Sequence, residues 1–501
     1  MAVNATETEI KYEAAADAVL PSFAGLPQVA RAEAAADEQL DADYFDTDDL
    51  RLISAGITLR RRQGGHDEGW HLKLPAGTNT RREIRLPLGQ ARRRVPAALA
   101  RLVLVHSRGR DLKPVARIST IRRRQLLVDG EGTSLAEVAS DDVTARALGK
   151  TTRWHEVEIE LTGGGRDVLD AADELLRRGG LHRSARSAKL ERALGLPETA
   201  SVRERPGTSA GDVLLDYLEA QVSALKAYDP MVRTDEPDAV HQMRVTTRRI
   251  RSTLQSFPVV RGGDSGARAG ELIAELRWLG GELGAARDAE VLAARLEERL
   301  AGLPAELVVG PVAARVRGHF ARIGAEALAA MGEALESARY FALLDNLDQL
   351  LGQREELSTV LTSTELKNAV RKTCKRTRRR MKHALSLPAG PGADVALHEA
   401  RKAAKRARYA AEAVAPAFGP RAREFARRMK NVQSVLGEHQ DAVIARGAVR
   451  ELGMAAHLEG ENAFSYGVIC ERETCAAGRL RKQARRAWRS ASRQRVRRWL
   501  R

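Results

Sequence analysis

Charged side chains alternate near the start of the chain in a way that could serve chemistry. In "TETEIKYEA" (residues 6–14), Glu7, Glu9 and Lys11 occupy every second position, so on a β-strand they would point to the same side. Two carboxylates at this spacing lie roughly 7 Å apart and repel each other unless something neutralises them. Water does so on an outer surface, whereas inside a cavity the carboxylates require a partner. The segment therefore indicates either a solvated strand face or a cation site.

Later segments show the same alternation, with one sign of charge prevailing on each. The segment "WHEVEIEL" places Glu156, Glu158 and Glu160 opposite apolar residues. The basic positions in the other segments are Arg60, Arg62, Lys73, Arg85, Arg117, Arg122 and Arg124. For any one strand, a solvated face is the common explanation. For the whole set, we favour a closed barrel with helices outside and charged faces lining the interior.

A barrel interior of this composition would suit phosphate chemistry. Guanidinium groups bind phosphate in a bidentate manner and stay charged, while carboxylates hold hard divalent cations such as Mg²⁺. Phosphoryl transfer is accelerated mainly by positioning and by neutralising charge on the phosphate oxygens. The sequence has no GxxxxGK[ST] loop and no competing Ser/His/Asp arrangement. It therefore predicts metal-dependent phosphoryl chemistry without a covalent nucleophile.

These segments resemble the CYTH superfamily, the triphosphate tunnel metalloenzymes, over about residues 4–195. Glu7-Thr-Glu9-Ile-Lys11 matches the ExExK signature, and "YFDTDDLRL", "GITLRRR", "HLKLP" and "EVEIEL" follow in the family's order. The resemblance implies an antiparallel β tunnel that hydrolyses or rearranges triphosphates with Mg²⁺ or Mn²⁺.

The resemblance also implies roles for individual residues. The implied metal ligands are Glu7, Glu9, Asp141, Glu156, Glu158 and Glu160, with Glu137 competing with Asp141. The implied phosphate-binding residues are Lys11, Arg60, Arg62, Lys73 and Arg85, with one or more of Arg117, Arg122 and Arg124. Arg117 falls on the opposite strand face from the other two unless a bulge intervenes. Lys189 resembles a lysine of a closing helix that orients water, and an exposed helix lysine is the equal alternative. The candidate catalytic groups are Glu9, Lys11 and Lys189.

The chain changes character after about residue 196. Before it we expect strands at 6–13, 39–46, 56–63, 69–75, 80–88, 114–128 and 154–162, and helices at 14–20, 26–35, 96–105, 167–178 and 185–194. A linker is expected at 197–211, and from 212 to 501 the apolar residues follow the helical period of 3.6. The predicted fold class is α+β in two domains. It joins an antiparallel β tunnel with flanking helices, at 1–196, to an all-helical bundle.

The helical part contains an internal duplication. "VHQMRVTTRRIRSTL" (240–254) aligns with "LHEARKAAKRARYAA" (397–411), and "LGAARDAEVL" (283–292) is echoed by "LGEHQDAVIA" (436–445). In both copies, one histidine and the basic residues 3, 7 and 10 positions later fall within an arc of about 80° on a helix. The predicted anion-binding residues are His241, Arg244, Arg248, Arg249 and Arg251, and His398, Arg401, Lys402, Lys405, Arg406 and Arg408.

The charge balance points to a polyanion as the ligand of this second part. Residues 1–200 carry 31 Lys and Arg against 30 Asp and Glu, whereas the remaining 301 carry 52 against 36. Nucleic acid, an anionic membrane and polyphosphate all fit such an excess. Aromatic residues are only 4% of the chain, which favours polyphosphate over single strands that need stacking platforms. Nucleic acid stays an alternative.

The duplicated motifs resemble the CHAD domain, over roughly 209–500. This helical module is often found behind CYTH domains, and the resemblance implies binding of inorganic polyphosphate. The expected activity is hydrolysis of inorganic triphosphate, with polyphosphate binding beside it. The alternatives are thiamine triphosphatase or adenylate cyclase activity in the same tunnel, or a non-catalytic polyphosphate-binding protein.

Cysteine usage and hydropathy suggest where the protein works. Three cysteines form no disulfide framework and no CxxC pair, as is typical of a reducing compartment. The sequence shows no apolar signal core after Met1 and no run of about 18 apolar residues. We expect a cytoplasmic protein, with association with polyphosphate granules as a further expectation and no protein partner. The basic tail at 479–501, with Trp488 and Trp499, could extend the polyanion groove or touch an anionic surface.

Overall fold

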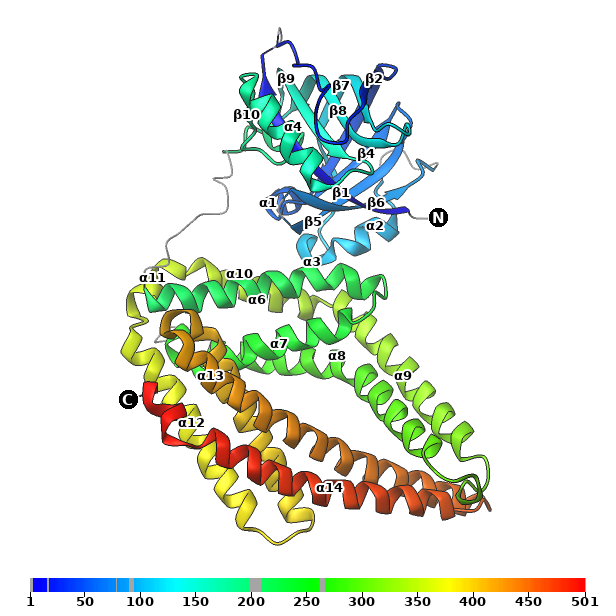
Figure 1. Ribbon diagram of the computed structural model, residues 1–501, viewed down its shortest axis with the longest axis vertical. Helices are drawn as coiled ribbons and strands as arrows, with labels where there is room; N and C mark the ends of the chain where they lie inside the picture. The colour runs from blue at the N-terminus through cyan, green and yellow to red at the C-terminus, as the bar shows by residue number, and fades with distance from the viewer. Residues whose placement is uncertain are drawn as a thin grey trace. The chain divides into compact units, whose positions relative to one another are not determined.

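The computed structural model describes residues 3–15, 18–77, 79–89, 94–197, 209–261 and 266–500. The chain divides into two compact units, residues 1–205 and 206–501 (Figure 1). The predicted linker at 197–211 lies mostly outside the described residues.

The first unit is an antiparallel β-barrel, as predicted. Within the described residues its closed wall follows the order β1 (Val3–Ala14), β6 (Thr80–Leu86), β5 (Gly69–Gly77), β4 (Thr58–Gln63), β3 (Glu38–Asp46), β7 (Lys113–Val128), β8 (Ser134–Ala147) and β9 (Lys150–Leu161). Strand β1 closes the barrel by changing neighbours. It pairs with β6 up to Thr8 and with β9 from Glu9 onward. The short strands β2 (Arg31–Ala34) and β10 (His182–Arg183) add to β7 and β1.

The barrel turns its apolar faces toward helices on the outside. Ile10 and Tyr12 of β1 pack with Val157 of β9 against Val168 and Leu176 of α4 (Arg166–Arg178). A second core joins β4, β5 and β6 to α1 (Arg51–Ser54) and α2 (Ala97–Leu102), followed by α3 (Leu104–Ser107). Because side chains alternate along a strand, these outward apolar positions send the charged neighbours inward. The inverted barrel expected from the alternation is therefore confirmed.

Some local predictions were wrong. Residues 26–35 do not form a helix: 31–34 are strand β2, paired with Gln125–Val128, because the edge of β7 supplies backbone partners that outweigh the helix propensity of Ala and Glu. The helix expected at 14–20 is also absent from its described residues, and Ala14 belongs to β1. Strand β8 was missed because Ser140, Asp141 and Asp142 are poor strand formers.

The second unit is all-helical in its described residues. Its main helices are α6 (Ala210–Arg233), α7 (Ala239–Ser256), α8 (Gly266–Ala301), α9 (Val312–Glu336), α10 (Ala338–Gly352), α11 (Arg354–Val360), α12 (Ser363–Ser386), α13 (Pro391–Leu458), α14 (Phe464–Ala491) and α15 (Gln494–Arg497). Gly419, with φ of 70°, breaks α13 into two helices. The order α6, α7, α8, α9 is thus repeated by α12, the two parts of α13, and α14 (Figure 1).

The basic tail folds back onto this unit. The ring of Trp499 lies 5.7 Å from that of Phe418 and 6.0 Å from that of Phe425, and Arg371 Nε donates to the carbonyl of Leu500 at 2.6 Å. Trp499 is therefore a packing residue. None of the described helices combines the length and hydrophobicity of a membrane span.

Candidate functional site

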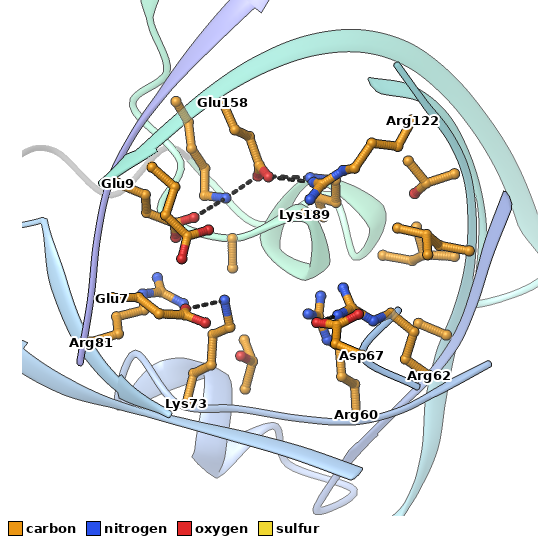
Figure 2. A pocket seen from close by; sticks show the side chains of 18 of the residues that line it. Glu7, Glu9, Arg60, Arg62, Asp67, Lys73, Arg81, Arg122, Glu158 and Lys189 are labelled. Carbon is orange, nitrogen blue, oxygen red and sulfur yellow. Dashed lines mark hydrogen bonds and ion pairs between the residues drawn. The ribbon is translucent and has the colours of Figure 1, made fainter. Parts of the chain in front are cut away.

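The interior of the barrel is a tunnel lined by charged side chains. Figure 2 shows side chains from several strands pointing into it. Glu7, Glu9 and Lys11 enter from β1, on the face opposite Ile10 and Tyr12. The other predicted residues on its lining are Arg60, Arg62, Lys73, Arg85, Arg122, Glu137, Glu158, Glu160 and Lys189. The predicted residues Asp141, Glu156 and Arg124 are not among its lining residues.

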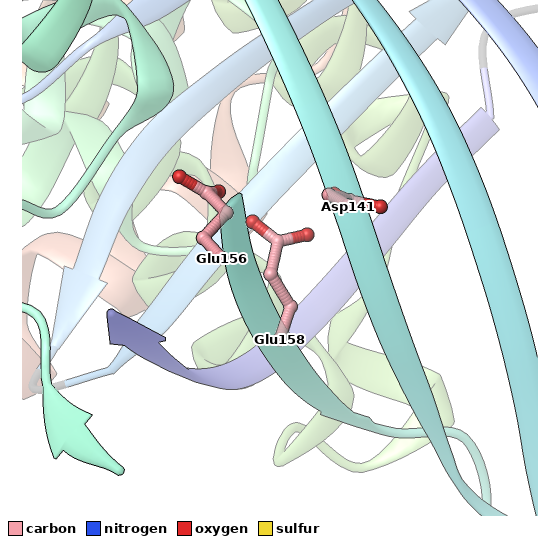
Figure 3. Close-up of side chains that lie close together, drawn as sticks. All are labelled: Asp141, Glu156 and Glu158. Carbon is pink, nitrogen blue, oxygen red and sulfur yellow. The ribbon is translucent and has the colours of Figure 1, made fainter. Parts of the chain in front are cut away.

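At one point of the tunnel, three acidic side chains meet one lysine. Carboxylate oxygens of Asp141, Glu156 and Glu158 lie within 4.8 Å of one another (Figure 3). Lys189, which begins α5 (Lys189–Ala193), places Nζ 2.9 Å from Asp141 Oδ2, 2.6 Å from Glu156 Oε1 and 2.7 Å from Glu158 Oε1. Clustered carboxylates of this kind suit a hard cation such as Mg²⁺ or Mn²⁺. We call Asp141, Glu156 and Glu158 the acidic triad.

Opposite charges around the acidic triad stabilise the ionised forms of Lys189 and Glu158. Burial works against the ammonium form of Lys189, but Glu156, Glu158 and Asp141 outweigh it and raise its pKa well above the ordinary value. Burial likewise opposes ionisation of Glu158, yet Lys11, Lys189 and Arg122 hold its pKa well below the usual range. Arg122 binds Asp141 through two nitrogens, at 2.8 and 2.7 Å. Lys189, Glu158 and Arg122 are therefore charged at neutral pH.

A second charged cluster includes an acid that sequence reasoning missed. Glu83 is fully buried, with His71 Nδ1 2.8 Å from its Oε1 and Arg85 Nε donating to its Oε2. Glu7 joins this cluster through Lys73 and through Arg85, whose Nη2 lies 3.1 Å from Glu7 Oε1. The alternation of Glu83 with Arg81 and Arg85 was the available signal. The basic wall of the tunnel thus carries its own buried carboxylates.

The arginines of β7 divide between the tunnel and the outside. Arg122 faces inward, and Arg124 pairs with Glu137 at 2.6 Å and with Glu38 at 3.0 Å. Arg117 is 57% exposed, lies outside the tunnel lining and has Nε 4.0 Å from Asp43. The pairing of β7 with β3 runs without a bulge from Arg117 to Arg122, so the two residues fall on opposite faces. Arg117 is corrected to an outer-surface residue.

Other lining residues differ in how their charge is compensated. Burial, together with Glu7 and Glu9, raises the pKa of Glu160 to about 7. Arg60 keeps a buried Nε without a hydrogen-bond partner among the described residues, and its Nη1 donates to Tyr44 Oη at 3.4 Å. Arg62 pairs with Asp67. Tyr44 and Asp67 were not predicted, because one sits on a mainly apolar face and the other in a loop.

In the helical unit, the two duplicated basic faces come together. Lys405 of α13 lies near Arg244, Arg248 and Arg251 of α7 and near Arg401. Burial and these neighbours lower the pKa of Lys405 to about 7. The buried Nε atoms of Arg244, Arg248, Arg249 and Arg401, and Nδ1 of His398, have no hydrogen-bond partner among the described residues. We call Lys405, these arginines and His398 the basic cluster. A bound anion would accept hydrogen bonds from its unpaired nitrogen donors.

The cavity beside this basic cluster adds two arginines to the predicted set. Arg277 of α8 and Arg376 of α12 line it with Lys402, Lys405 and Arg406. Sequence reasoning missed them because it followed the duplicated motifs, although the run "KRTRRRMK" (375–382) in α12 was a signal.

Other predicted members of the helical set already have partners or lie at the cluster's margin. Arg408 is paired with Glu412 at 2.6 Å, and Arg249 lies over the ring of Tyr409. His241 is half-buried, and burial lowers its pKa.

Comparison with known proteins places both units in families. Residues 5–193 match the CYTH domain and residues 216–450 match the CHAD domain. Uncharacterized proteins of two Mycobacterium tuberculosis strains are 39% identical over 498 residues, covering 95% of this chain and 94% of theirs. PptA from Streptomyces chartreusis is 22% identical, with 56% of this chain and 99% of that chain covered and a TM-score of 0.46. The CHAD domain from the plant Ricinus communis is 25% identical, with 58% and 91% covered and a TM-score of 0.40. The chain belongs to the family of proteins that join a CYTH triphosphate tunnel domain to a CHAD domain.

Proposed function

We propose that the tunnel hydrolyses inorganic triphosphate with Mg²⁺ or Mn²⁺ and that the helical unit binds inorganic polyphosphate. The observation that carries the first part is the tunnel lining, where buried carboxylates and buried cations alternate around one cavity. A site that only bound anions would gain nothing from the carboxylates. A site that bound only a metal would not need this many arginines.

In the proposed reaction, water attacks a terminal phosphorus, the P–O–P bond breaks, and diphosphate and phosphate leave. Arg60, Arg62, Lys73 and Arg85 would hold the phosphate oxygens and spread their charge. Lys11 and Lys189, held among the carboxylates, would orient water and the reacting phosphate. Glu9 is the candidate acceptor of the water's proton.

The acidic triad, with Glu7, Glu9 and Glu160, would hold the divalent cation. The fit rests on the chemistry of the donors, which are carboxylate oxygens throughout. When bound, the cation would polarise phosphate oxygens and lower the pKa of water.

The tunnel assignment is tested by phosphate release from tripolyphosphate, ATP, thiamine triphosphate and long polyphosphate. Each substrate is assayed with Mg²⁺, Mn²⁺ or EDTA, and cyclic AMP is measured with ATP. We expect metal-dependent release from tripolyphosphate that is lost in Glu7→Gln and kept in Glu131→Gln, which changes an exposed turn residue. Preference for thiamine triphosphate, or formation of cyclic AMP, would replace the proposed substrate. No release from any compound would leave a binding protein.

The polyphosphate assignment is supported by the open nitrogen donors of the basic cluster. It is tested by binding of long polyphosphate, with DNA and RNA as competitors at equal phosphate concentration. We expect Lys405→Gln to weaken binding and Arg322→Gln, a change at an exposed pair on α9, to leave it intact. Stronger binding of nucleic acid would overturn the assignment.

The two activities would support each other, since both units belong to one chain. Polyphosphate held by one unit would raise the concentration of phosphate chains near the other. We place this function in the cytoplasm and at polyphosphate granules, where the three unpaired cysteines would stay reduced.

A further inference from the structure

Two glycines in the helical unit pack against the guanidinium groups of two arginines. A Cβ atom placed on Gly284 of α8 would lie 3.2 Å from each of Nε, Cζ and Nη2 of Arg244. A Cβ atom on Gly437 of α13 would lie 3.5, 3.7 and 3.4 Å from the same atoms of Arg401. The three equal distances at Gly284 place its Cβ position over the face of the Arg244 guanidinium, closer than an ordinary contact, whereas the distances at Gly437 are those of ordinary van der Waals contact with Arg401.

The two contacts occupy equivalent positions of the duplication. Arg244 and Arg401 each stand three residues after the motif histidine, and each glycine stands four residues before Asp288 or Asp441. The chain between arginine and glycine differs in length in the two copies, yet the same contact forms. The contact therefore belongs to the repeated unit and is not an accident of one helix pair.

Glycine at these positions has no backbone explanation. Neither Gly284 nor Gly437 has a positive φ, and glycine in a helix lowers helix stability relative to alanine. Gly281 of α8 and Gly447 of α13 are also helical, but nothing lies within 4 Å of their Cβ positions. Space for a guanidinium thus distinguishes Gly284 and Gly437 from glycines in the same helices.

Both arginines belong to the basic cluster, which remains open to an anion. Each has a buried Nε without a hydrogen-bond partner among the described residues, and both lie near Lys405. Asp288 further fixes Arg244 through two bonds of 2.8 and 3.0 Å. A guanidinium fixed in its plane presents its N–H groups in the fork geometry that matches phosphate oxygens.

We infer that Gly284 is a positioning residue for phosphate chains: by lacking a side chain it seats Arg244 flat on α8 with donors available to the ligand, and Gly437 packs against Arg401 at the equivalent, looser position of α13. This inference rests on the proposed polyphosphate binding. It assigns a function to the "LG" part of the duplicated motifs, which the distribution of charge alone does not explain.

The test compares four Gly→Ala variants of the full chain. Gly284→Ala and Gly437→Ala place a methyl group against a guanidinium, whereas Gly281→Ala and Gly447→Ala place one in open space on the same helices. All four remove a helix glycine, so the two controls should melt at or above the wild-type temperature. We expect long polyphosphate to bind Gly284→Ala about three- to tenfold more weakly, as for the loss of one good charge-assisted contact, and Gly437→Ala to show a smaller loss because its methyl group meets Arg401 at ordinary contact distance. Tripolyphosphate hydrolysis should be unchanged in all four.

A double-mutant cycle separates positioning from damage to the fold. If Gly284 acts through Arg244, Gly284→Ala should weaken binding in the wild-type background and have little further effect in Arg244→Gln. Equal affinities for all four alanine variants, or an undiminished effect of Gly284→Ala in Arg244→Gln, would overturn the inference while wild-type binding upheld the proposed function. Absence of polyphosphate binding in the wild type would instead overturn the proposed function itself.

Discussion

Nζ of Lys189 lies 2.7 Å from Oε1 of Glu158 inside the barrel. The lysine comes from the short helix α5 and the glutamate from β9, so the contact joins a helix to the tunnel wall. The lysine sits among the same carboxylates that would hold a divalent cation. The ammonium group and a divalent cation would therefore compete for one set of ligands.

Replacing Lys189 by methionine should show whether a divalent cation can take the place of the ammonium group among the carboxylates. Removing one partner of a buried ion-pair network costs about 3–5 kcal/mol, so the variant should melt at a lower temperature in EDTA. Mn²⁺ should then restore more stability than it adds to the wild type, because three carboxylates are left without their lysine. Triphosphate hydrolysis should fall at least about a hundredfold, as expected for the loss of a positioned cationic group.

Thermal melting with and without Mn²⁺, together with phosphate release, measures both effects. Lys113→Met, which removes an exposed ion pair with Asp48, is the matched control. Equal stabilisation by Mn²⁺ in Lys189→Met and in the wild type would show that the metal does not use the acidic triad.

Glu83→Gln should lower the stability of the protein but increase its affinity for triphosphate. The carboxylate is fully buried and compensates Lys73 and Arg85, so its loss should lower the free energy of unfolding by about 1–3 kcal/mol. The two cations would then be less neutralised, and KM for tripolyphosphate should fall. Urea unfolding and steady-state kinetics test the pair of effects, and a rise in KM would contradict the electrostatic argument.

Arg122→Gln and Arg117→Gln should differ sharply although both change an arginine of β7. Arg122 is 15% exposed and binds Asp141 and Glu158, whereas Arg117 is 57% exposed on the outer face. We expect Arg122→Gln to lose at least about tenfold in kcat/KM and Arg117→Gln to keep the wild-type value. Comparable losses in the two variants would place Arg117 in the tunnel after all.

Polyphosphate binding should weaken as the pH rises above 7. With a pKa of about 7, Lys405 is protonated below that pH and mostly neutral at pH 9. A bound anion raises its pKa again, so binding at higher pH requires the uptake of a proton. Affinity should therefore fall by up to about tenfold per pH unit above 7.

The pH interval from 7 to 9 isolates this effect. Burial lowers the pKa of His241 and of His398 from 6.5, so neither histidine titrates there. Titration calorimetry in two buffers of different ionisation enthalpy counts the protons taken up. Lys405→Arg keeps the charge but removes the titration, and a pH dependence that survived in this variant would have another origin.

The inverted charge pattern could be predicted from the sequence because period-two alternation is a backbone property. The inward face of β1 and the glutamates of β9 follow from it directly. Tertiary pairing could not be predicted in the same way: β2 forms because β7 offers it an edge, and β8 contains residues that disfavour strands. Glu83 lies in the predicted strand at 80–88, but its role depends on His71 from the neighbouring strand. Arg277 and Arg376 reach their cavity only through helix packing, which one helix's sequence does not specify.

The change of neighbours along β1 has a consequence for how the chain is made. Residues 9–14 of β1 pair with 155–160 of β9. During synthesis, β1 therefore leaves the ribosome well before the strand with which it pairs. Until β9 has left the exit tunnel, half of β1 keeps an open edge, and the charged and apolar faces both meet water. Long-range pairing of this kind slows folding and exposes the nascent chain to aggregation. Synthesis that stalls before residue 161 should therefore yield an unclosed sheet that depends on chaperones and is an easy target for proteases.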